Sequence, residues 1–133
     1  MHAAVLRDFL TGRLGSLQLL RDLGEVAELP GEPVLPFDAL DEPFDLSPRH
    51  LLALCEAVEL RDLEPVVLSR VSRVLAGSGS FRWTRTDPDG RVVEEVLVEW
   101  SRQAPAGLDP ESMPIFRDWL VTRRRPERFG PLL

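Results

Sequence analysis

The stretch SFRWTRTDPDGRVVEEVLVEW, residues 80–100, decides the fold class, because it can form either a β-hairpin or a strand that leads into a helix. In its first part, Phe81 and Trp83 alternate with polar residues, which is typical of a strand with one buried face. In its centre, residues 87–90 read Asp-Pro-Asp-Gly, with proline second and glycine fourth, which predicts a type I turn.

The part after this turn fits a helix better than a strand. On a helix, its apolar residues fall at i, i+1, i+4, i+5 and i+8 and form one stripe: Val92, Val93, Val96, Leu97 and Trp100. On a strand, Glu94 would interrupt the apolar face. The many valines favour a strand, because β-branched residues prefer sheets. We therefore predict a short strand, a turn and a helix, with the hairpin as the alternative.

Other helices are indicated by their starts. Ser47-Pro48 and Asp109-Pro110 each place a capping residue before proline and an apolar stripe. Asp62 is expected to cap another helix, which ends at Gly77-Ser78-Gly79. Apolar clusters at 5–10 and 17–26, the second including Leu17, predict two more near the N-terminus. The predicted fold is mainly α: a small helical domain of about five helices, with a short strand or β-hairpin near 80–93.

The composition indicates one domain over residues 1–133. With 133 residues, 44% of them hydrophobic, the chain is long enough to bury a core without metal or disulfide support. Its single cysteine indicates a reducing compartment, and no secretory signal or membrane-spanning pattern is visible, so we expect a cytoplasmic location without membrane contact. All 16 basic residues are arginine, which indicates a bacterial, GC-rich genome.

Charge is unevenly distributed along this acidic chain. Residues 22–64 hold 12 carboxylates against two arginines, whereas residues 117–133 hold five arginines against two carboxylates. An acidic surface repels nucleic acid and attracts basic surfaces. We expect another protein with a basic surface as partner, and no nucleic acid. The basic C-terminal tail, residues 122–133, is predicted to be solvated or folded over the acidic range.

The connection between residues 30 and 46 carries four prolines, which exclude a helix interior or a central strand. It also holds large apolar residues, so we expect an ordered loop held against the body of the domain. With Trp83, which we expect to be partly exposed, this loop supplies the predicted partner-binding residues: Phe37, Asp38, Asp41, Glu42, Phe44, Asp45 and Trp83.

Candidate catalytic residues are few. His50 falls in the first turn of the helix that starts at Pro48, and Cys55, five positions on, lies about 140° away around that helix. We predict a structural or surface role for His50, and core positions for Cys55, Trp100 and Trp119. Two histidines and one cysteine are too few ligands for a zinc site. The carboxylates of residues 38–45 lack the spacing of a calcium-binding loop. We predict no metal, no cofactor and no enzymatic activity.

Residues 47–120 carry a faint family pattern. Its parts are residues 51–58 (LLALCEAV), 62–65 (DLEP), Phe81-x-Trp83, 92–101 (VVEEVLVEWS) and Met113-x-x-Phe116-x-x-Trp119-Leu120. This pattern resembles small bacterial proteins, some of them similar to immunity proteins of polymorphic toxin systems. The resemblance lies in core-type residues, so it implies a fold and brings no catalytic residue.

The predicted function is that of a non-catalytic protein-binding module. It could be an immunity-type protein that neutralises a basic toxin through an acidic face. The alternative is a structural or assembly subunit of a bacterial complex, acting as a homo-oligomer or adaptor. The chain itself is expected to be a monomer or homodimer.

Overall fold

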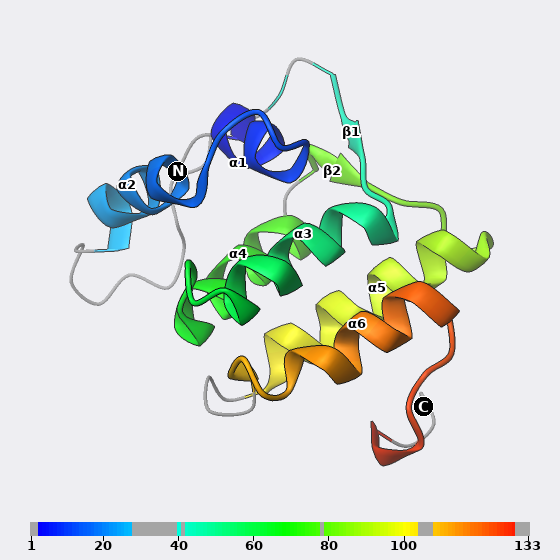
Figure 1. Cartoon of the computed structure of the whole chain (residues 1–133). Coiled ribbons are helices and arrows are strands. Elements are labelled where there is room, and N and C mark those ends of the chain that lie inside the picture. Colours follow the sequence, from blue (N-terminus) through cyan, green and yellow to red (C-terminus); the bar gives the residue numbers. More distant parts are fainter. Residues whose placement is uncertain (1–2, 28–39, 41, 78, 104–107, 130–133) are drawn as a thin grey trace.

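The computed structural model describes residues 3–27, 40, 42–77, 79–103 and 108–129, and these ranges are mainly helical (Figure 1). They contain six α-helices: α1 (Ala3–Leu10), α2 (Ser16–Ala27), α3 (Pro48–Glu59), α4 (Pro65–Gly77), α5 (Pro88–Arg102) and α6 (Met113–Thr122). They also contain two strands, β1 (Phe44–Asp45) and β2 (Phe81–Arg82), and the 3-10 turn η2 (Glu127–Phe129). No helix within these ranges combines the length and the apolar character needed to cross a membrane.

The opening stretch forms a short strand followed by a helix, so the prediction of a helix is confirmed and the hairpin alternative is wrong. The Asp-Pro-Asp-Gly sequence is the start of α5 and not a separate type I turn. The Asp87 carboxylate accepts a hydrogen bond from the Asp89 backbone N–H at 3.2 Å, and the Arg91 N–H donates to the Asp87 carbonyl at 2.8 Å. A type I turn and the first turn of an α-helix both begin with right-handed helical backbone. The Asp-Pro-Asp-Gly sequence therefore fits the start of a capped helix as well as it fits a turn.

Packing in α5 follows the predicted stripe. Its apolar residues are at most 2% exposed: Val92, Val93, Val96, Leu97 and Trp100. Val98, which lies off the stripe, is 40% exposed. Gly90 brings the first turn close to the segment before it, because a Cβ at this position would lie 1.9 Å from the Thr84 carbonyl oxygen.

The two strands join segments that are far apart in sequence. They pair in parallel, with Phe44 opposite Phe81 and Asp45 opposite Arg82. The Phe44 N–H donates to the Ser80 carbonyl at 2.7 Å, and the Leu46 N–H donates to the Arg82 carbonyl at 2.8 Å. This pairing ties the end of the 30–46 connection to the segment before α5 (Figure 1).

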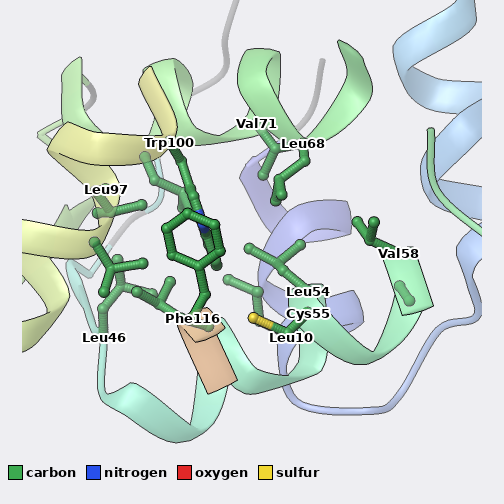
Figure 2. Packing of buried hydrophobic residues seen from close by; sticks show 14 of the residues in the cluster. Leu10, Leu46, Leu54, Cys55, Val58, Leu68, Val71, Leu97, Trp100 and Phe116 are labelled. Carbon is green, nitrogen blue, oxygen red and sulfur yellow. The ribbon is translucent and has the colours of Figure 1, made fainter. Parts of the chain in front are cut away.

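The helices pack chiefly in two pairs, α4 with α5 and α3 with α6. α3 also contacts α1 and α5, and α1 packs against α2. Figure 2 shows the interior, where side chains from α1, α3, α4, α5 and α6 meet. At its centre, the rings of Trp100 and Phe116 lie edge to face with centroids 5.8 Å apart. Trp100 and Trp119 are fully buried, which confirms their predicted core positions.

Two local predictions are wrong. α4 begins at Pro65 and not after an Asp62 cap, because the Asp62 N–H donates to the Ala57 carbonyl in the turn that ends α3. α6 begins at Met113, because the Asp109 carboxylate accepts from the Ser112 N–H in a preceding turn. The predicted end of α4 at Gly77 is confirmed.

Candidate partner-binding surface

The predicted partner-binding residues fall into two groups. Phe37, Asp38 and Asp41, and most of the 30–46 connection, lie outside the described residues. The others lie in or beside the two strands: Glu42, Phe44, Asp45 and Trp83.

The pairing of β1 with β2 places the aromatic and acidic residues on opposite faces. Phe44 points inward, with its ring centroid 4.9 Å from that of His50 and 6.0 Å from that of Phe81. Trp83 is half-buried and packs against the core, as expected for a partly exposed residue. Asp45 is exposed, because successive strand residues point to opposite sides. The aromatic residues therefore support the core here and do not share one outer face with the carboxylates.

The charge of Asp45 is balanced by Arg82, its neighbour in the sheet. Nε of Arg82 donates to the Asp45 carboxylate at 2.5 Å, and both side chains are exposed. The hydrogen bond and the negative charge of Asp45 raise the pKa of Arg82. Glu42 is exposed and forms no ion pair with another described residue.

His50 serves the start of α3. Its Nδ1 accepts a hydrogen bond from the Ser47 backbone N–H at 3.0 Å, and its side chain is buried. Burial, with a smaller effect of the positive charge of Arg49, lowers the pKa of His50. The lowered pKa favours the neutral ring, whose Nδ1 accepts the backbone N–H that caps α3, and this is a structural role.

Cys55 is part of the core and fully buried. Burial raises its pKa to about 12; the charge of Glu59 adds to this shift, and that of Arg117 opposes it. This raised pKa disfavours the thiolate, which is the nucleophilic form of cysteine. Among the described residues, no three histidine, cysteine or carboxylate side chains come together in a way that could hold a metal ion.

The described part of the basic tail packs against α5 and α6. Nε of Arg123 lies 2.8 Å from the Asp89 carboxylate, and a terminal nitrogen of Arg125 lies 3.6 Å from the Glu99 carboxylate. Phe129 stacks on Trp119 with ring centroids 5.4 Å apart. Arg123 and Arg125 therefore pair with carboxylates of α5. The prediction that the tail folds over the acidic range of residues 22–64 is wrong for these two arginines.

An open groove of about 480 Å³ lies between α6 and this tail. Its lining mixes apolar residues with charges of both signs: Pro114, Ile115, Asp118, Arg124, Arg125, Pro126 and Glu127.

A surface that the sequence analysis missed lies where α3 turns into α4. Leu60 is 63% exposed and Val66 is 36% exposed. The surrounding carboxylates are exposed and form no ion pair with a described residue: Glu56, Asp62 and Glu64. The sequence holds one indication that Leu60 is exposed, because this leucine follows Val58, the last residue of the apolar stripe of α3.

Four carboxylates of the acidic range flank α3, two before it and two after it in the chain. Glu42 and Asp45 precede this helix, whereas Asp62 and Glu64 follow it. A helix of 12 residues is about 18 Å long. The two groups are thus separate surfaces within the described residues.

No protein-family model, curated protein or solved structure matches this chain. The resemblance of residues 47–120 to small immunity-like bacterial proteins stays a prediction.

Proposed function

We propose that this chain is a non-catalytic protein-binding module that docks on a basic surface of another protein. The observation that supports this most is the surface where α3 turns into α4. There the exposed Leu60 lies within four residues of three exposed carboxylates, Glu56, Asp62 and Glu64, which form no ion pair with a described residue. Complementary charge accelerates the encounter of two proteins, and a few apolar side chains then hold the complex.

The non-catalytic part of the proposal is supported by the two residues best suited to chemistry. His50 uses Nδ1 to cap α3, and the buried thiol of Cys55 has a raised pKa. Both side chains belong to the framework of the fold.

Within this function, we favour an immunity-type role in a bacterial cytoplasm. Such a protein would neutralise a basic toxin by occlusion, that is, by covering the surface that the toxin uses. The acidic composition and the resemblance of residues 47–120 support this role. Cys55 is a free cysteine, which fits a reducing compartment.

The test is co-expression of the tagged chain with the products of the genes next to its own. We expect one neighbour to be a basic protein that co-purifies in a stoichiometric complex, and the chain to relieve its toxicity. The association rate should fall as ionic strength rises. If no neighbour binds and none is toxic, the immunity role is wrong.

The structural or assembly role is the second candidate, and exposed apolar residues on other helices favour it. Leu17 on α2 and Val121 on α6 are 61% and 58% exposed. Light scattering on the purified chain distinguishes the two functions, because a defined oligomer supports the assembly role and a monomer supports docking on a different protein.

A further inference from the structure

We propose that the partner binds at the α3–α4 corner, which we define as Glu56, Leu60, Arg61, Asp62, Glu64 and Val66. This inference rests on the proposed function and adds its location and its chemistry. The occupant is a basic protein segment that inserts an apolar side chain beside Leu60 and places arginines or lysines against the carboxylates.

The apolar part of the corner is held in place by the backbone. The N–H groups of Asp62 and Leu63 both donate to the Ala57 carbonyl, at 2.8 and 3.2 Å. Leu63 is buried, with 2% of its surface exposed, so it anchors the turn from inside. Leu60 therefore points outward as a consequence of the turn geometry, and its large exposed surface is available without a change in the fold.

The charges of the corner favour a positively charged partner. Three exposed carboxylates, Glu56, Asp62 and Glu64, lie within four residues of Leu60 in the sequence, and Arg61 is the one cation of the corner as defined. Some carboxylates on other elements do have an arginine partner, as Glu94 has Arg85 at 2.6 Å. Because none of the three corner carboxylates has such a partner among the described residues, the corner carries net negative charge.

The two features together favour a basic protein segment over nucleic acid. A phosphate backbone would be repelled by the carboxylates and would offer no apolar group to Leu60. A basic amphipathic helix presents both required groups on adjacent faces.

A peptide titration followed by NMR tests this proposal on the full chain. The probe is a synthetic helical peptide with one leucine stripe flanked by arginines and lysines. Its matched control has glutamine at every basic position. We expect saturable shifts of the amide signals of residues 56–66 with the basic peptide, which weaken as ionic strength rises, and none with the control peptide.

Variants separate the two parts of the corner. Leu60→Ser should weaken binding about tenfold, because it removes the apolar anchor. Its control is Val121→Ser, which changes an equally exposed apolar residue on α6 and should leave the affinity unchanged. Glu56→Gln, Asp62→Asn and Glu64→Gln together should remove the salt dependence. The control triple, Glu111→Gln, Asp118→Asn and Glu127→Gln, should keep it. All these side chains are exposed or half-exposed, so the fold persists.

The outcomes distinguish this inference from the proposed function. Saturable shifts at Glu42 and Asp45, or along the groove beside α6, would overturn the corner as the site and leave the function standing. Concentration-dependent shifts of residues 56–66 without peptide would show that a second copy occupies the corner, which overturns the proposed occupant. No saturable shift with the basic peptide would contradict both proposals.

Discussion

The guanidinium of Arg125 lies 3.6 Å from the Glu99 carboxylate and 5.1 Å from the centre of the Trp119 ring. Glu99 is 7% exposed, so this ion pair is largely shielded from solvent. Arg125 also donates to the Phe129 carbonyl at 3.2 Å, and Phe129 stacks on Trp119. One arginine thus joins the C-terminal segment to both α5 and α6.

Loss of Arg125 should therefore destabilise the whole domain. Arg125→Met removes one of the two arginines that pair with the largely buried Glu99 carboxylate, which keeps Arg102 at 3.9 Å and the Gln103 side-chain amide at 3.3 Å. We expect the free energy of unfolding to fall by about 2 kcal/mol. Urea denaturation followed by tryptophan fluorescence measures it. The control is Arg85→Met, which breaks an ion pair of 2.6 Å with Glu94 at an exposed position and should cost less than about 1 kcal/mol. Equal losses in the two variants would contradict the role of Arg125 in joining the C-terminal segment to α5 and α6.

Gly90 should be the least replaceable glycine of the described chain. A Cβ there would lie 1.9 Å from the Thr84 carbonyl oxygen, so Gly90→Ala must push apart two backbone segments. We expect a loss of about 3 kcal/mol or more in the free energy of unfolding. At Gly79, a Cβ would have nothing within 4 Å, and Gly79→Ala should change the free energy by no more than about 0.5 kcal/mol. A tolerated Gly90→Ala would mean that this contact is not close in solution.

The helices were predictable because their evidence is local. The stripe of α5 and the proline at the start of α3 and α5 act within a few residues of the chain. The strand pair was not predictable, because Phe44 and Phe81 meet only after the helices between them have packed. The same strand pairing explains why the predicted partner-binding residues do not form one outer surface. It turns Phe44 inward and places Asp45 beside Arg82.

Arg61 adopts a left-handed backbone with φ of 64°, at a position after a helix where glycine is preferred. Its side chain is exposed and forms no ion pair with a described residue. Arg61→Gly should therefore raise the free energy of unfolding by about 0.5–1 kcal/mol. Thermal unfolding measures the change.

Arg123 provides the comparison for this substitution. It has a similar φ of 61°, but its side chain donates to the carbonyls of Leu120 and Val121 and pairs with Asp89. Arg123→Gly loses these contacts and should not stabilise. Stabilisation by both substitutions would show that side-chain contacts contribute little at Arg123.

The candidate corner was hard to predict for a different reason. The carboxylates of residues 22–64 are visible in the sequence, but which of them are compensated depends on arginines from distant elements. Glu59 is paired with Arg117 of α6 at 2.7 Å, whereas Glu56, one turn earlier, has no such partner among the described residues. Charge counting along the chain therefore gives the net charge of a range and not the place on the surface where uncompensated charge lies.

The capping role of His50 predicts a pH dependence of stability. Its pKa is lowered from the ordinary value of 6.5, because burial and, to a smaller extent, the positive charge of Arg49 disfavour the imidazolium. The unfolded chain therefore binds this proton more readily than the folded chain. The contribution of His50 is fully present above pH 6.5 and is lost as pH falls from there through the lower folded pKa.

His50→Gln separates this effect from the titration of carboxylates. Glutamine at the third position of a helix can accept the same backbone N–H, but it does not titrate. Denaturation curves between about pH 8 and about pH 5 should show wild-type stability falling relative to the variant as the solution becomes acidic. A constant difference between the two proteins across this range would mean that the His50 ring is protonated as easily in the fold as in the unfolded chain.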